Sequence, residues 1–119
     1  MLVVEDDAAS AKLVSVVLQG EGCVVRAVES AEEAERALTD FDPRLIVLDL
    51  VLPTMSGLLF AQRLAAREGE RPVVVATSVM NDPEVTRLAL AAGCAVYLTK
   101  PIDPIALPGV IAACLGGPA

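Results

Sequence analysis

Residues 45–57 read LIVLDLVLPTMSG, and this stretch decides the fold. Leu45 to Leu48 form an uninterrupted apolar run, which is typical of a parallel strand that helices cover on both faces. The run ends at the carboxylate of Asp49, so the strand leads directly into a polar group. The sequence therefore predicts a buried strand with an acid at its carboxyl end.

The rest of the chain repeats this pattern, with helical spacing between short apolar runs. The other predicted strands are residues 2–4, 23–28, 73–76 and 95–99. Strands that alternate with helices predict a doubly wound α/β domain, in which right-handed crossovers build a parallel sheet with helices on both faces. Binding sites in such sheets lie at the carboxyl ends of the strands. The polar residues that follow the runs there are Glu5, Asp6, Asp7, Asp49, Thr77, Ser78, Thr99 and Lys100.

Several helix ends carry recognisable signals. Ser30 with Glu33 predicts a capping box for a helix over residues 31–39. Asp82-Pro83-Glu84 predicts another helix start, with an acceptor at the N-cap and proline in the first turn. Just past three helix ends, where a left-handed residue is favoured, we expect Gly20, Gly69 and Gly93.

Composition narrows the function. The chain has 119 residues, which fits one domain, and its 55% hydrophobic residues with only 3% aromatics predict an aliphatic core. Nine basic against 16 acidic residues give 9 − 16 = −7, which disfavours direct nucleic-acid binding. The sequence has no histidine, which excludes a Ser-His-Asp hydrolase, a His-ligated metal centre and a phosphohistidine carrier. Any phosphohistidine must therefore come from a partner.

The expected unit is a single domain over residues 1–115, followed by a tail or linker start at residues 116–119. No signal peptide or membrane span is recognisable, so we expect a cytoplasmic protein. The three cysteines are widely spaced and are interpreted as reduced apolar residues: Cys23, Cys94 and Cys114.

Four carboxylates at one sheet edge would repel one another: Glu5, Asp6, Asp7 and Asp49. The set offers oxygen ligands without histidine or a nearby cysteine, which suits Mg²⁺. Lys100 supplies a second cation from a neighbouring strand end. The alternative is structural, with Glu5 to Asp7 capping the first helix and Asp49 capping the third.

These residues give the chain a resemblance to response regulator receiver domains over essentially its full length. The matching pieces are Glu5-Asp6-Asp7 after a strand, residues 45–57 with Asp49, Pro53 and Gly57, the strand 73–77 ending in a hydroxyl, and residues 97–101, YLTKP. The resemblance implies a flavodoxin-like (βα)5 fold, with a five-stranded parallel sheet in the order 2-1-3-4-5. It also implies a signalling module whose phosphoryl donor is a sensor histidine kinase or a phosphotransfer protein.

The resemblance further implies roles for the acids. Asp49 would be the phosphoacceptor, and Asp6, Asp49 and the backbone carbonyl of Val51 would bind Mg²⁺ directly. Glu5 would hold a metal-bound water. This assignment takes Glu5-Asp6 as the acidic pair, with Asp6-Asp7 as the other register.

The remaining implied roles concern the switch. Thr77 would donate its hydroxyl to the phosphoryl group, and Lys100 would bridge that group and the acceptor. Tyr97 would be the aromatic whose rotamer follows phosphorylation, and the Lys100–Pro101 bond would be cis. Phosphorylation would shift the surface of the fourth helix, fifth strand and fifth helix, where an effector domain or a second copy would dock.

Two local questions stay open. Counting forward from Pro72 selects Thr77 as the switch hydroxyl, whereas counting back from Lys100 selects Ser78; we prefer Thr77, because a small residue normally follows the hydroxyl. Pro108-Gly109 falls early in the expected last helix. Either a turn at Asp103-Pro104 precedes a helix that starts again at Pro108, or the helix is kinked. Residues 105–115 are apolar nearly all round, which fits either deep burial or a docking face.

Other functions are weaker. A Mg²⁺-dependent aspartyl phosphatase needs an acid two residues after the nucleophile, and Val51 stands there. A flavin or nucleotide binder needs a phosphate loop after the first strand, where Glu5 to Asp7 would repel the phosphate. A degenerate receiver that acts only as a scaffold would not need the acids and Lys100. We therefore expect a signalling phosphoacceptor that catalyses only its own phosphorylation and dephosphorylation.

Overall fold

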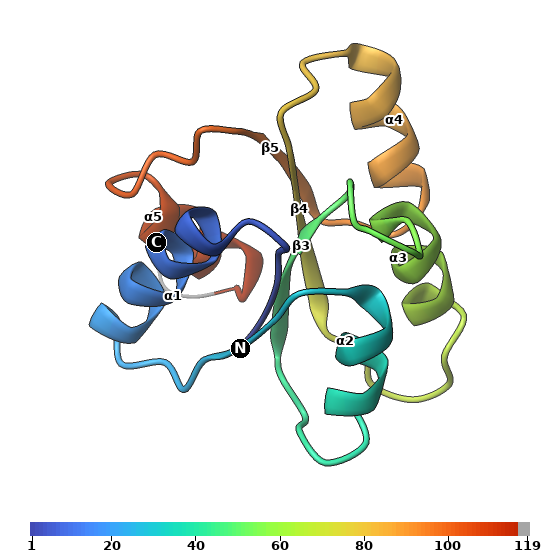
Figure 1. Ribbon diagram of the computed structural model, residues 1–119, viewed down its shortest axis with the longest axis horizontal. Coiled ribbons are helices and arrows are strands. Elements are labelled where there is room, and N and C mark those ends of the chain that lie inside the picture. Colours follow the sequence, from blue (N-terminus) through green and yellow to red (C-terminus); the bar gives the residue numbers. More distant parts are fainter. Residues whose placement is uncertain (117–119) are drawn as a thin grey trace.

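The computed structural model describes residues 1–116 and contains one five-stranded sheet in the order β2-β1-β3-β4-β5 (Figure 1). Its strands are β1 (Leu2–Val4), β2 (Arg26–Val28), β3 (Leu45–Asp49), β4 (Val73–Ser78) and β5 (Val96–Thr99). Every neighbouring pair runs parallel. The predicted fold class and strand order are confirmed. Residues 117–119 of the predicted tail lie outside the described part of the chain.

Helices cover both faces of the sheet. Figure 1 shows α1 (Ala8–Gly20) and α5 (Leu107–Cys114) on one side, with α2 (Ala31–Ala37), α3 (Gly57–Ala65) and α4 (Pro83–Ala91) on the other. We call these the α1/α5 face and the α2–α4 face. Among residues 1–116, no helix has the length and apolar character needed to span a membrane.

Each face has its own aliphatic core. On the α1/α5 face, Val3, Val47 and Val75 pack with Leu18 and Ile111. On the α2–α4 face, the residues that alternate with those valines along each strand pack around the buried ring of Phe60. Because successive side chains of a strand point to opposite faces, a residue's parity along its strand decides which core it joins. The same parity decides where each residue at the carboxyl edge points.

Strand β2 is shorter than the predicted range 23–28. It lies at the sheet edge beside β1, which has only three residues, so only Arg26 to Val28 find ladder partners. The Met1 main chain extends this contact, with its carbonyl accepting from the Arg26 amide at 3.0 Å. The residues just before Arg26 are thus held near the Met1 main chain but have no strand partner in the sheet.

Helix α2 begins as predicted and ends two residues early. The Ser30 hydroxyl accepts from the Glu33 amide at 3.1 Å, while the Glu33 carboxylate accepts from the Glu29 amide at 2.9 Å. Past Ala37 the amides of Thr39 and Asp40 bond three residues back, so the last turn tightens and the predicted end at Thr39 is wrong.

Helix α4 begins at Pro83, as predicted, with the Asp82 carboxylate accepting from the Glu84 amide at 2.9 Å. Gly93 follows the C-cap with φ +102°, also as predicted. Gly20, in contrast, is the last residue of α1, and the left-handed residue is Gly22, because the C-cap is Glu21. Gly69 has φ +85° but lies in the turn beyond the C-cap of α3 rather than beside it.

The two alternatives for the last helix are resolved by its start at Leu107. Asp103 opens a turn, with its carboxylate accepting from the Ile105 amide at 2.9 Å and its carbonyl accepting from the Leu107 amide at 3.0 Å. Pro108 then lies in the first turn of α5, where its missing amide costs no hydrogen bond. Leu107 and Ile111 are buried, whereas Ile105 is exposed, so only one side of this apolar segment joins the core.

Candidate functional site

The carboxyl edge of the sheet gathers polar residues on the α1/α5 face. Asp49 ends β3 and is paired in register with Thr77 of β4, so both continue the face that carries the core valines two residues earlier. Glu5 and Lys100 each lie one residue past a strand, and their amides extend the ladder by donating to the carbonyls of Val28 and Ser78. All four side chains therefore belong to one face.

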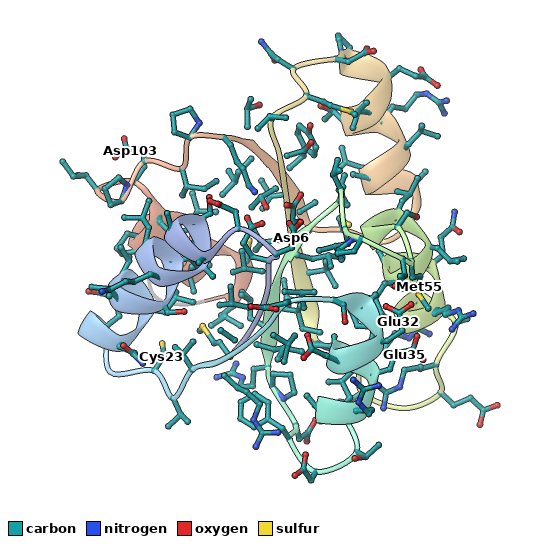
Figure 2. All side chains as sticks on the ribbon, in the orientation of Figure 1. Asp6, Cys23, Glu32, Glu35, Met55 and Asp103 are labelled. Atoms are coloured by element: carbon teal, nitrogen blue, oxygen red, sulfur yellow. The ribbon has the colours of Figure 1, made fainter. Side chains whose placement is uncertain are left out.

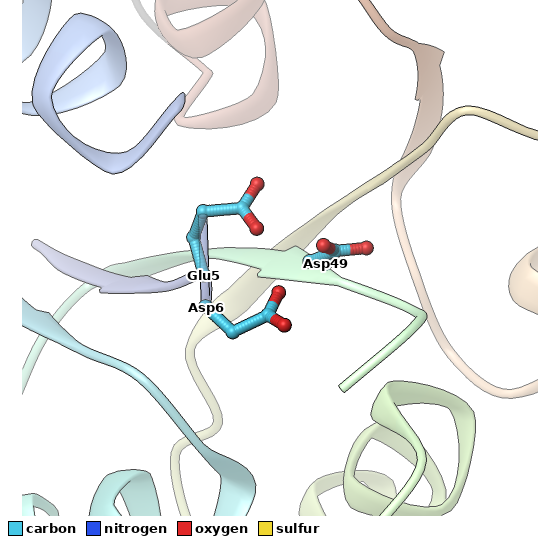
Figure 3. Close-up of side chains that lie close together, drawn as sticks. All are labelled: Glu5, Asp6 and Asp49. Atoms are coloured by element: carbon cyan, nitrogen blue, oxygen red, sulfur yellow. The ribbon is translucent and has the colours of Figure 1, made fainter. Parts of the chain in front are cut away.

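Three carboxylates come together at this edge. Oxygen atoms of Glu5, Asp6 and Asp49 lie within 4.8 Å of one another. Figure 3 shows the Glu5 and Asp6 side chains extending from the end of β1 toward Asp49. Glu5 and Asp49 are 6% and 5% exposed, whereas Asp6 is open to solvent. Asp6 is thus the solvent-exposed member of the cluster.

Lys100 supplies the positive charge of the cluster. Its Nζ lies 3.0 Å from Asp49 Oδ2 and also donates to Glu5 Oε1. Its side chain is only 13% exposed, so these ion pairs are shielded from water. The cation therefore bridges the ends of β1 and β3 from the end of β5.

The pKa values reflect this crowding. Burial raises the pKa of Glu5 to about 7, the shared contact with Asp49 adds to the rise, and Lys100 opposes it. Burial alone would lower the pKa of Lys100, but its hydrogen bonds to Glu5 and Asp49 outweigh burial and the pKa is raised. Lys100 accordingly stays charged at neutral pH. Its single positive charge does not balance the three carboxylates when all of them are ionised.

The backbone around Asp49 is held closely. The Val51 amide donates to Asp49 Oδ1 at 3.0 Å, which fixes the carboxylate whose other oxygen contacts Lys100. The Gly57 amide donates to the Leu50 carbonyl at 3.0 Å, and a Cβ on Gly57 would lie only 2.2 Å from the Asp49 carbonyl oxygen. Glycine is required at this position because the chain crosses so near the acid.

The structural alternative holds for one acid of the four. Asp7 is the N-cap of α1, where its carboxylate accepts from the Ser10 hydroxyl at 2.7 Å and the Ser10 amide at 3.0 Å, and these bonds lower its pKa. Asp49 does not cap α3, since Ser56 does. The structure thus places Glu5 and Asp6, and not Asp7, in the cluster with Asp49.

The two candidate hydroxyls lie on opposite faces. Thr77 pairs with Asp49 on the α1/α5 face and is buried. Ser78 follows it on the α2–α4 face, together with the half-buried ring of Tyr97. The Tyr97 hydroxyl donates to the Met80 carbonyl in the loop between β4 and α4.

The Lys100–Pro101 peptide bond is cis, as predicted. Val51 is half-exposed beside the acids. Sequence reasoning missed the contact of Lys100 with Glu5, because 95 residues separate the two and nothing in either segment indicates their approach. Parity along β1 and β5 is the one signal that could have placed both side chains on the same face.

The cysteines lie away from this edge. All three are free, Cys94 is buried, and burial raises the pKa of its thiol to about 11. A thiol with so high a pKa is poorly reactive at neutral pH. Cys94 therefore agrees with the interpretation as an apolar residue, and all three cysteines are free as predicted.

Comparisons with known proteins extend this picture. The family profile described as "Response regulator receiver domain" matches residues 1–112. The DNA-binding response regulator MtrA of Mycobacterium tuberculosis is 36% identical over 104 residues, which cover 87% of this chain and 45% of MtrA. The chain therefore spans about half the length of the curated relatives it matches.

Solved receiver structures have the same fold. The beryllium-fluoride-activated DrrB receiver domain superposes with a TM-score of 0.87 at 27% identity, covering 97% of this chain and 95% of that one. A CheY-like receiver domain protein from Methanospirillum hungatei gives 0.86 at 26% identity, covering 97% and 91%. Together with the profile match and the carboxylate cluster at the sheet edge, these likenesses lead to one conclusion: the chain belongs to the response regulator receiver domain family.

Proposed function

We propose that this receiver domain accepts a phosphoryl group on Asp49 from the phosphohistidine of a sensor kinase or phosphotransfer protein. The observation that carries the proposal is the position of the Asp49 carboxylate, which is buried beside the exposed Asp6 and contacts Lys100. A carboxylate held in this way is a fixed nucleophile, and the negative charge on the transferred phosphoryl oxygens would meet a nearby cation.

The donor set fits a divalent ion. Three carboxylates and one ammonium sum to −3 + 1 = −2 when all are ionised, so Lys100 alone does not balance them. Hard oxygen donors without nitrogen or sulfur suit Mg²⁺. Asp6, Asp49 and the Val51 carbonyl would hold the ion, with Glu5 acting through a bound water. When bound, Mg²⁺ would offset the repulsion between Asp49 and the incoming phosphoryl group.

The residues of the chain perform the transfer by position and charge. An oxygen of Asp49 attacks phosphorus, the bond from phosphorus to the donor imidazole breaks, and its electron pair stays on the imidazole. The product is an acyl phosphate. Lys100 and the Thr77 hydroxyl stabilise the charge on the transferred oxygens, which is the main contribution that proteins make to phosphoryl transfer. The domain acts on itself and turns over no other substrate.

The charge added to Asp49 would attract polar groups at the ends of β4 and β5. Thr77 and Lys100 lie on neighbouring strand ends, so a shift of both moves the loop that leads into α4. The α4, β5 and α5 surface, with Tyr97, then changes its equilibrium between two arrangements. An effector domain or a second copy would bind there.

The cellular setting follows from the same chemistry. MtrA is a DNA-binding protein, and this chain matches only part of it, so any DNA contact would come from an effector rather than from residues 1–115. The net charge of −7 supports this division. With a phosphohistidine donor of the sensor kinase kind, the domain would act in the cytoplasm.

Intact-mass spectrometry tests the proposal. Incubation with acetyl phosphate and MgCl₂ should add one phosphoryl mass to the wild type, and EDTA should abolish the gain. Asp49→Asn should gain nothing, whereas Asp42→Asn, a matched change at an exposed residue, should behave as wild type. A wild type that gains no phosphate would indicate a degenerate receiver, and continuous phosphate release from added phosphomonoesters would indicate a phosphatase.

A further inference from the structure

Ser78 is a buried hydroxyl that the proposed phosphoryl transfer does not use. It is 1% exposed and ends β4 directly after Thr77, on the opposite face of the sheet. A buried hydroxyl costs free energy unless it is hydrogen-bonded. Its Oγ accepts from the Met80 amide at 3.1 Å, which fastens the start of the β4–α4 loop to the strand.

A second side chain holds the same loop residue. The Tyr97 hydroxyl, from the neighbouring strand β5, donates to the Met80 carbonyl. Met80 is therefore held at its amide by β4 and at its carbonyl by β5. Val79 and Met80 are 72% and 48% exposed, so apolar burial contributes little to holding the loop. The Met80 main chain is held by these two hydrogen bonds.

Ser78 is also joined to the charged cluster. Its carbonyl accepts from the Lys100 amide at 2.7 Å, and the Lys100 ammonium contacts Asp49 and Glu5. A displacement of Lys100 toward added charge on Asp49 acts on the Ser78 main chain first. From there it reaches Met80 through the Ser78 hydroxyl, and then Tyr97.

We propose that Ser78 is a positioning residue, whose hydroxyl holds Met80 as the acceptor of Tyr97 and so couples the charge state of Asp49 to the tyrosine ring. The inference rests on the proposed function and goes beyond it, because it assigns the coupling to Ser78, one residue past the hydroxyl that faces Asp49. Without the Ser78 hydroxyl the Met80 amide is released, and Tyr97 loses a fixed acceptor whether or not Asp49 is modified.

The chain is suited to a direct test, since Tyr97 is its only tyrosine and it has no tryptophan. Tyrosine fluorescence therefore reports on this one ring. Wild type, Ser78→Ala, Ser78→Thr and the matched Ser30→Ala, which removes the α2 cap hydroxyl, are treated with acetyl phosphate and MgCl₂. The fluorescence change is divided by the phosphorylated fraction from intact mass, so that slower phosphorylation does not mimic lost coupling.

We expect a fluorescence change per phosphorylated molecule in the wild type, the same change in Ser30→Ala, loss of the change in Ser78→Ala, and its recovery in Ser78→Thr. An unaltered response in Ser78→Ala overturns the inference and leaves the proposed function intact. A wild type that takes up no phosphate overturns both.

Amide hydrogen exchange of the wild type supplies a readout that needs no variant, should Ser78→Ala fail to fold. The Met80 amide should be protected from exchange although its side chain is exposed. Free exchange of that amide would contradict the hydrogen bond to Ser78 and overturn the inference.

Discussion

The two faces of the sheet end in different chemistry at the same edge. The α1/α5 face ends in charged groups, where Lys100 joins Glu5 and Asp49 away from water. The α2–α4 face ends in neutral hydroxyls, where Ser78 and Tyr97 hold a loop main chain. Buried charges interact strongly and fix a geometry, whereas a neutral hydrogen bond contributes only about 1 kcal/mol net. One face is therefore suited to chemistry, and the other to movement.

Gly57→Ala should produce the largest effect, because the added Cβ displaces the backbone that carries Asp49 on the charged α1/α5 face. The added Cβ would lie 2.2 Å from the Asp49 carbonyl oxygen and 2.7 Å from the Leu50 Cα, so the backbone that carries Asp49 must shift. We expect a loss of about 3 kcal/mol in the free energy of unfolding, measured with urea.

Gly109→Ala in α5 is the matched control, since a Cβ there would have no heavy atom within 4 Å. It should leave stability unchanged or raise it by up to about 1 kcal/mol. Equal stability of the two variants would show that the close approach of Gly57 does not constrain the site.

Lys100→Met should come next, because it removes the cation and keeps much of the aliphatic side chain. Loss of one preorganised charge donor costs about 100-fold or more in rate. The initial rate of phosphorylation by acetyl phosphate, followed by intact mass, should fall by that factor. Arg87→Met removes an exposed ion pair with Glu84 and should keep the wild-type rate; equal rates in both variants would remove Lys100 from the mechanism.

Because of Glu5, the free energy of unfolding measured in EDTA should fall as pH rises, the opposite of what a carboxyl with a lowered pKa would cause. Its pKa is raised to about 7 in the folded chain, so between its ordinary value and that pH the folded state binds more protons than the unfolded state. The free energy of unfolding should therefore fall as pH rises through this window. Urea unfolding at several pH values should show the fall in the wild type and a flatter profile in Glu5→Gln, while Glu21→Gln, at the exposed end of α1, keeps the wild-type slope. Identical profiles for wild type and Glu5→Gln would contradict the assignment.

Tyr97→Phe should have the smallest effect on the free energy of unfolding, which tests the contrast between the α1/α5 face and the α2–α4 face. It removes only the hydroxyl that donates to the Met80 carbonyl, while the ring keeps its packing on the α2–α4 core. The expected cost is about 1 kcal/mol in urea unfolding. A loss as large as that of Gly57→Ala would mean that this contact is structural rather than switchable.

The fold was readable from sequence because its signals are local. The apolar run before Asp49 and the cap at Asp82 depend on neighbours within a few residues, and both lie where predicted. The predicted ends that failed depend on distant partners or on cap geometry. Strand β2 is limited by the length of β1, and the left-handed glycine after α1 is Gly22 rather than Gly20 because of where the helix stops.

The candidate site was readable only in part. Polar residues after strands predicted the edge where Asp49 and Lys100 meet, since parallel strands end together. The residues alone allowed all three successive acids either purpose, but the preferred register, with Glu5-Asp6 as the acidic pair, agrees with the structure, in which Asp7 caps α1. The sequence did not reveal the hold of Ser78 and Tyr97 on Met80, which depends on how a loop folds back over two strands.

The position of the phosphoryl group is the most direct test of the role of Asp49. An acyl phosphate is reduced by borohydride to an alcohol, so treatment after acetyl phosphate and MgCl₂ converts the modified aspartate to homoserine, which peptide mass spectrometry locates. Conversion should occur at Asp49 alone and should require Mg²⁺. Conversion at another acid, or at Asp49 to the same extent in EDTA, would contradict the proposed mechanism.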